Sequence, residues 1–197
     1  MKLLADFFKG LKIPTPISNP YLTGVSEESF YNFLKSRDSN FYKNHSLIEG
    51  GGLESYYVPD IVYFNKNNGL VIDIEIDEPY LGADGTPIHY EGYDDSRNKF
   101  FRNNGWIIVR FTEEQVVIAP TLCYEFIKNL VDRVLLGKLE IEYGKIERFP
   151  QWTKDEGHKL AFSRYRNRYL KANLVERMSE ERLIEKKSKL SNFYDLD

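Results

Sequence analysis

Residues 69–80 read GLVIDIEIDEPY, and this stretch places three acidic side chains inside an apolar segment. In an extended strand alternate side chains share a face. One face is then purely apolar, with Leu70, Ile72, Ile74 and Ile76. The other face carries a row of carboxylates, which we call the carboxylate ladder: Asp73, Glu75 and Asp77.

Neighbouring ladder carboxylates are about 6.6 Å apart, and at an effective dielectric constant of ~20 each like-charge pair costs roughly 2.5 kcal/mol. Something must offset this repulsion: bulk water, a raised pKa, basic partners or a bound cation. The sequence leaves these four alternatives open.

Composition indicates a globular chain, because 42% of its 197 residues are hydrophobic and 15% are aromatic. Cys123 is the single cysteine, so an intramolecular disulfide is excluded and a reducing, cytoplasmic location is expected. No run approaches ~18 uninterrupted apolar residues, which argues against a membrane span. The net charge is −3, but residues 150–197 carry more basic than acidic side chains.

Local patterns predict an α/β chain with a mixed sheet flanked by helices. A helix is expected near 26–36, followed by a strand hairpin over 55–64 and 69–77 with a turn at Asn68-Gly69. A helix over 93–104, closed by Gly105, should lead into a buried strand over 106–111. A further helix is expected over 121–136, ended by Gly137. The start of the chain also reads as a helix, and the glycines at 50–52 as a flexible turn.

Both faces of the segment 106–111 are apolar, with Trp106 and Ile108 on one side and Ile107 and Val109 on the other. This composition predicts a central strand covered by helices. The chain then divides into an N-terminal helix and connection (1–25), a core (26–137) and a basic helical extension (138–197).

Two helices are predicted in the extension, near 154–172 and 175–190. Helical spacing places Phe162, Tyr165 and Tyr169 on one stripe that should dock on the core. The basic side chains would then face outward and bind phosphate, or else pair with acidic neighbours of the same helices. They are Arg164, Arg166, Arg168 and Lys171.

Several motifs follow one another in an informative order. They are Glu27 in SEESFYNFL, Pro59-Asp60, the E-I-D of Glu75 and Asp77, Asp95 and Arg97 in DDSRNKFF, and GWIIVRF at 105–111. In this order they resemble the PD-(D/E)xK nuclease superfamily, and within it the very-short-patch-repair-like, DUF559-type endonucleases. The resemblance covers about residues 26–115 and implies a restriction-endonuclease-like fold.

The resemblance implies a catalytic group of Asp60, Glu75, Asp77, His89 and Arg97, with Glu27, Asp60 and Glu75 holding Mg²⁺ or Mn²⁺. Hard carboxylate oxygens suit such ions, which lower the pKa of a bound water. Many members of the superfamily have Lys where this chain has Asp77, so His89, Arg97 or Lys99 would have to supply the missing charge or proton. Alternatively, Arg97 or Arg110 only compensates the ladder.

The segment PYLGADGTPIHY (79–90) is longer than the resemblance predicts and should form a loop over the cleft. The function expected is a metal-dependent endonuclease that acts on DNA, as a monomer, a homodimer or part of a larger complex. The alternative is an inactive nuclease-fold module that binds DNA or a protein partner. Neither a phosphate-binding loop nor a dinucleotide fingerprint occurs in the sequence.

Overall fold

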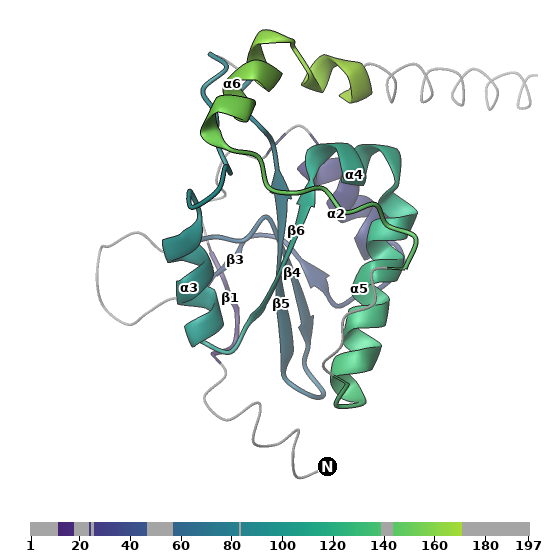
Figure 1. Cartoon of the computed structure of the whole chain (residues 1–197). Helices are drawn as coiled ribbons and strands as arrows, with labels where there is room; N and C mark the ends of the chain where they lie inside the picture. Colours follow the sequence, from purple (N-terminus) through teal and green to yellow (C-terminus); the bar gives the residue numbers. More distant parts are fainter. Residues whose placement is uncertain are drawn as a thin grey trace, which may run out of the picture.

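The computed structural model describes residues 12–17, 24, 26–46, 57–82, 84–138 and 144–170. In this part of the chain, helices cover a small mixed sheet on both faces (Figure 1). The strands are β1 (Thr15–Pro16), β2 (Phe41–Tyr42), β3 (His45–Ser46), β4 (Ile61–Asn65), β5 (Leu70–Asp77) and β6 (Ile107–Thr112). The helices are α2 (Glu27–Lys35), α3 (Asp95–Asn103), α4 (Glu113–Ile118), α5 (Pro120–Leu135) and α6 (Lys154–Phe162).

The main sheet has the order β2-β4-β5-β6. Strands β4 and β5 form the predicted antiparallel hairpin, with Asn65 opposite Leu70 and Gly69 at a φ of 77° in the turn. Glycine adopts this left-handed backbone without a steric penalty. Strand β4 begins at Ile61 and is shorter than the predicted 55–64. Strand β6 runs parallel to β5, and α3 makes the crossover between them.

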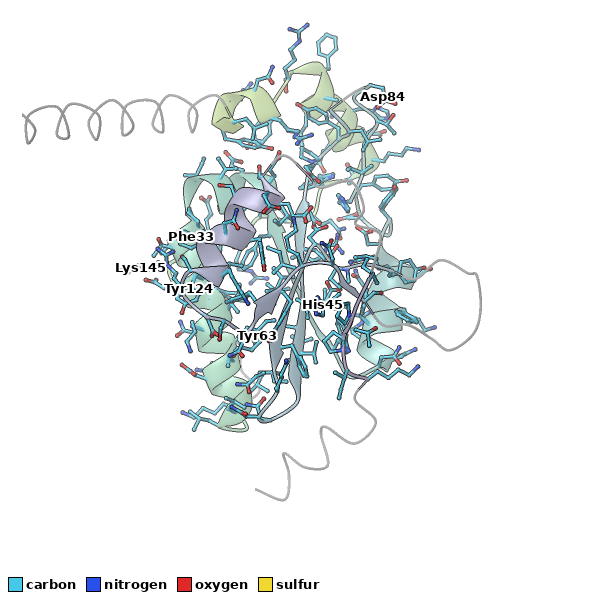
Figure 2. All side chains as sticks on the ribbon, turned by 180° about the vertical axis from the view of Figure 1, so that it is seen from behind. Phe33, His45, Tyr63, Asp84, Tyr124 and Lys145 are labelled. Atoms are coloured by element: carbon cyan, nitrogen blue, oxygen red, sulfur yellow. The ribbon has the colours of Figure 1, made fainter. Side chains whose placement is uncertain are left out.

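Strand β5 is the most buried element of the sheet, since all eight of its residues are buried. Its isoleucines face a core shared with α2 and α5, where Leu34 and Ile127 are fully buried. Phe33 and Tyr124 lie at the outer side of this core (Figure 2). On the opposite face, Val71 packs with Phe101 of α3 and with Trp106. The ladder carboxylates are on this second face, beneath α3.

Strand β6 confirms the predicted division of its faces. Trp106 and Ile108 pack on the α3 side, while Ile107 and Val109 pack on the α5 side. The predicted central position is wrong, because β6 is the last strand of the sheet in the described residues. Its faces are apolar because α3 and α5 extend over the sheet edge. A cavity of about 380 Å³ lies between the strand and residues 146–152.

The helices α2, α3 and α5 confirm the predicted ones within a few residues. The predicted helix over 154–172 is interrupted, because α6 ends at Phe162 and Arg164 has a φ of 52°. This left-handed residue turns the chain before helical structure resumes at residue 166. The prediction that the aromatic stripe docks on the core is therefore wrong for Phe162, whose side chain is 94% exposed. Tyr169 of the same stripe is buried.

Several predictions lie outside the described residues. They concern the N-terminal helix before residue 12, the glycines at 50–52, Lys171 and the helix over 175–190. In the part of the chain that is described, no helix is both long and apolar enough to cross a membrane.

The core beneath α5 offers a test of the assigned faces. Ile74→Ala should lower the free energy of unfolding by about 2–5 kcal/mol, because Ile74 is fully buried and the substitution leaves a cavity. Leu136→Ala is the matched control, because Leu136 is 70% exposed, and it should change stability by less than about 0.5 kcal/mol. Urea unfolding measures both. Equal effects would contradict the placement of the core.

Candidate functional site

The carboxylate ladder is offset in part by Arg97 of α3. Its Nη2 donates hydrogen bonds to Glu75 Oε1 and, at 3.2 Å, to the carbonyl oxygen of Val58. Its Nη1 lies 3.6 Å from Asp73 Oδ2, within ion-pair range but too far for a hydrogen bond. The guanidinium also lies over the ring of Phe101. One partly buried arginine therefore faces two ladder carboxylates.

Asp77, the outermost ladder residue, is neutralised by Arg110 of the neighbouring strand. The Nε and Nη2 atoms of Arg110 donate to the two carboxylate oxygens of Asp77 at 2.9 and 2.6 Å. Arg110 Nη2 also donates to Asp94 Oδ2 at 2.8 Å. His89 completes the group, with Nδ1 2.8 Å from the same Asp94 oxygen. Such bidentate, charge-assisted contacts are the strong class of hydrogen bonds.

The ladder carboxyls differ in pKa although they share one strand. Burial and the charge of Glu75 hold the pKa of Asp73 well above its ordinary value. Burial would also raise the pKa of Glu75, but the charges of Arg97 and Arg110 and the hydrogen bond from Arg97 help to outweigh it, and the pKa is lowered. Burial raises the pKa of Asp77 despite its bond to Arg110. Asp73 therefore favours the neutral form, while Glu75 stays ionised.

His89 is held in a protonation-favouring environment. Burial would lower its pKa, but the hydrogen bond to Asp94 and the charge of Asp77 outweigh that effect and raise it. In return, the pKa of Asp94 is lowered, because His89 and Arg110 outweigh its burial. The backbone of His89 is left-handed, with a φ of 52°, which is uncommon for a residue other than glycine.

A separate cleft of about 320 Å³ opens beside the end of β5, and we call it the β5 cleft. Its ionisable lining comes from distant parts of the sequence: Glu27, Asp60, Glu78, His89 and Arg166. The cleft is bounded partly by the 79–90 segment, whose turn brings Tyr80 opposite Pro87 and lies beside α6, as the position of Asp84 shows (Figure 2). This segment therefore borders the cleft, as expected of a loop there.

Asp60 connects the β5 cleft with the ladder. Its carboxylate Oδ2 accepts a hydrogen bond of 2.7 Å from the amide of Ile76, and its own amide donates to Glu75 Oε1 at 3.2 Å. Burial, followed by the charges of Glu75 and Glu27, raises the pKa of Asp60 well above the ordinary value. Asp60 thus lies close enough to both Glu75 and Glu27 to be repelled by their charges.

Glu27 is the first residue of α2 and is buried. Lys43 Nζ lies 2.9 Å from its Oε1, and the amide of Gly24 donates to its Oε2 at 3.0 Å. Glu78 is close by, because a Cβ added at Gly24 would stand 2.5 Å from Glu78 Oε1. Glycine at position 24 therefore allows the two glutamates to approach the same backbone.

Two predicted placements need correction. Asp77 faces the Arg110 group, and neither it nor Glu75 lines the β5 cleft. Arg166 was expected to face outward toward phosphate, yet it is buried and bound to Glu113. The interrupted helix explains this, because the turn at Arg164 redirects the side chains that follow it. Lys99, Arg164 and Arg168 are exposed, as a phosphate-binding role requires.

Sequence reasoning missed three contributors to the site: Glu78, Asp94 and Lys43. Glu78 follows the strand end, where the alternation of faces no longer predicts direction. Asp94 is next to the motif residue Asp95, but it is Asp94 that is buried and Asp95 that is exposed. Lys43 carries no local signal at all. Lys43 directly follows β2, and it reaches Glu27 of α2 once β2 has paired with β4.

In the described residues, one set of three potential metal ligands has ligand atoms all within 4.8 Å of one another: Asp77, His89 and Asp94. Arg110 donates to both carboxylates of this set and therefore already supplies the positive charge that a cation would bring. Glu27, Asp60 and Glu75 do not form so compact a set. They would have to move closer together to share one ion.

Comparison of the chain with protein-family models, with curated proteins and with solved structures finds no match. The resemblance to a nuclease family therefore rests on the sequence motifs alone.

Asp73 offers a test of the buried ladder. In the described part of the chain neither of its carboxylate oxygens has a hydrogen-bond partner, and the residue is fully buried. Because its pKa is raised by folding, the folded state keeps a proton that the unfolded chain loses near pH ~4. Wild-type stability should therefore fall as pH rises above ~4 through the folded-state pKa.

Asp73→Asn removes this titration, so its stability relative to wild type should increase from acidic to neutral pH, by roughly 1–3 kcal/mol. Urea unfolding between acidic and neutral pH measures the difference. The exposed Asp95→Asn is the control and should show no such trend. A difference independent of pH for Asp73→Asn would contradict a neutral buried carboxyl.

Proposed function

We propose that this chain is a metal-dependent endonuclease that hydrolyses phosphodiester bonds in DNA. The observation that carries the proposal is the gathering of Glu27, Asp60 and Glu75 where β4 begins and β5 ends. Burial, followed by the charges of Glu75 and Glu27, raises the pKa of Asp60, and a bound cation would offset these neighbouring charges.

The order of the elements supports the same proposal. An acid begins α2, Asp60 precedes β4, Glu75 and Asp77 lie in the last part of β5, and Arg97 lies on α3. The GWIIVRF segment then leads into β6. This succession is the one that the resemblance to the very-short-patch-repair-like endonucleases implies. The fold alone would not establish an activity, so the argument depends on the side chains.

The donor set fits a magnesium-type ion in chemistry. Glu27, Asp60 and Glu75 would hold it with carboxylate oxygens, the hard ligands that such ions prefer. When bound, the ion would polarise a phosphate oxygen and lower the pKa of a water. Arg97 keeps Glu75 ionised and therefore ready to act as a ligand.

His89 is the residue best placed to move a proton. It lines the β5 cleft with Asp60, and its Nδ1 is engaged by Asp94. Nε2 is then the nitrogen that remains for proton transfer. Its raised pKa favours the protonated form, which can donate to a leaving oxygen. His89 would thus perform one task of the missing motif lysine.

A second function is favoured by one specific observation. Arg97 and Arg110 already offset Glu75 and Asp77, so the ladder can be buried without a cation. A chain that had lost catalysis but kept its fold would show the same pairing. The alternative is therefore an inactive nuclease-fold module that binds DNA or a protein partner.

Divalent-ion-dependent cleavage separates the two functions. With Mg²⁺ or Mn²⁺ and a panel of duplex, mismatched, branched and single-stranded DNA and RNA, the wild-type chain should cleave a DNA substrate, and EDTA should abolish cleavage. Glu75→Gln and Asp60→Asn should each lower the rate by about a hundredfold or more, because each removes a charged ligand of the ion.

Glu125→Gln on the exposed face of α5 is the matched control and should cleave like the wild type. Circular dichroism and urea unfolding would verify that each variant is folded. Absence of cleavage across the whole panel, together with DNA binding that does not need a divalent ion, would favour the inactive module.

The exposed basic residues predict how salt affects DNA binding. Arg164→Ala and Arg168→Ala together should weaken binding and make the dependence of log K on log salt shallower, by roughly 0.9 for each phosphate that the variant no longer neutralises. Lys99→Ala should act in the same direction. Lys138→Ala, at the far end of α5, is the control. Fluorescence anisotropy at several salt concentrations measures the slopes, and unchanged slopes would remove these residues from the DNA interface.

A further inference from the structure

A buried polar cluster surrounds Glu113, the first residue of α4, whose side chain is fully buried. Arg166 donates to its two carboxylate oxygens, from Nε at 2.6 Å and from Nη2 at 2.8 Å. Ser26 Oγ and Tyr169 Oη also donate to this carboxylate, at 2.9 and 2.8 Å. We call these four residues the Glu113 cluster. It joins the start of α2, the start of α4 and the segment after α6.

Arg166 also contacts the chain that leaves β5. Its Nη1 donates to the carbonyl oxygen of Tyr80 at 3.1 Å, and its backbone amide donates to the Tyr80 hydroxyl at 3.1 Å. Its Nη2 lies 3.9 Å from Glu78 Oε1. Through these contacts the guanidinium becomes part of the lining of the β5 cleft.

The members of the cluster adjoin the residues that carry carboxylates into the cleft. Ser26 immediately precedes Glu27, and Tyr80 follows Glu78 by two residues. Glu113 therefore binds the segment of Glu27 through Ser26, and Arg166 binds the segment of Glu78 through Tyr80. A shift of the guanidinium would change the distance between the segments and with it the arrangement of the carboxylates.

We infer that Arg166 and Glu113 are positioning residues that hold Glu27, a proposed ion ligand, and the neighbouring Glu78 in place in the β5 cleft and thereby set the affinity of the site for a divalent cation. This inference rests on the proposed function. It gives the segment after α6 a role in building the cation site, in addition to any contact of its exposed arginines with DNA.

A purely structural role is the competing explanation, and it makes a different prediction. A buried ion pair is weak evidence for stability, because desolvation can cancel its attraction. A conservative change that keeps the charge should therefore leave the fold intact. Arg166→Lys is such a change. It removes the guanidinium that binds both Glu113 and the Tyr80 carbonyl oxygen, because an ammonium cannot form the same bidentate contact.

The test measures Mn²⁺ affinity of the full chain by isothermal titration calorimetry, together with thermal unfolding in the absence of metal. Arg166→Lys and Glu113→Gln should bind Mn²⁺ at least tenfold more weakly than the wild type. Arg102→Lys, an exposed arginine of α3, should bind Mn²⁺ like the wild type. In cleavage assays Arg166→Lys should need a tenfold higher Mn²⁺ concentration for half-maximal rate, with the rate at saturating Mn²⁺ unchanged.

Recovery at high Mn²⁺ is the readout that a structural role would not produce. Folded Arg166→Lys and Glu113→Gln variants with Mn²⁺ affinity within twofold of the wild type would overturn the inference and leave the proposed function standing. Unfolding of both variants would make the pair structural and also overturn it. A wild-type chain that binds no Mn²⁺ would overturn the metal-dependent function and the inference together.

Discussion

The contact between Arg97 and the carboxylate ladder is the interaction on which the arrangement of the sheet depends. Asp73 and Glu75 lie side by side on a fully buried strand, where like charges repel strongly and water cannot screen them. Arg97 binds Glu75 and faces Asp73, and Arg110 binds Asp77. Two of the four alternatives that the sequence left open, basic partners and a raised pKa, are therefore both in use.

This compensation also specifies how the elements assemble. Arg97 comes from α3 and Arg110 from β6, so the ladder charges attach the crossover helix and the parallel strand to β5. Apolar contacts of Val71, Phe101 and Trp106 pack the same unit together. Hydrophobic burial provides most of the driving force, but it is non-directional, whereas the forked guanidinium contacts select one register. The unit β5-α3-β6 is thus defined by charge as well as by packing.

The sequence predicts well what depends on local periodicity and poorly what depends on strand order or on single backbone angles. Alternation along 70–77, together with Asn68-Gly69, predicts the hairpin, and the faces of β6 follow from its composition. The position of β6 at the edge of the sheet does not follow from its composition. Two apolar faces show that helices cover the strand, but they do not require a neighbouring strand on each side. The exposure of Phe162 and the burial of Arg166 follow from one left-handed residue, Arg164, which no periodic pattern predicts.

The ladder and the β5 cleft differ in how completely their charges are compensated, and this difference indicates where a cation would act. Burial would raise the pKa of Glu75, but Arg97 and Arg110 together help to lower it. In the cleft, Asp60 and Glu78 have raised pKa values, since burial and neighbouring carboxylates exceed what Arg97 and Arg166 offer them. The pKa values of Asp73 and Asp77 are raised in the ladder too, so the contrast lies in geometry. Arg97 and Arg110 bind Glu75 and Asp77 directly, whereas Arg166 lies 3.9 Å from Glu78 in the cleft, beyond hydrogen-bond range. The cleft therefore receives less positive charge than the ladder. A divalent ion held by the cleft carboxylates would supply it, and this is the physical reason to favour a metal-dependent enzyme over an inactive module.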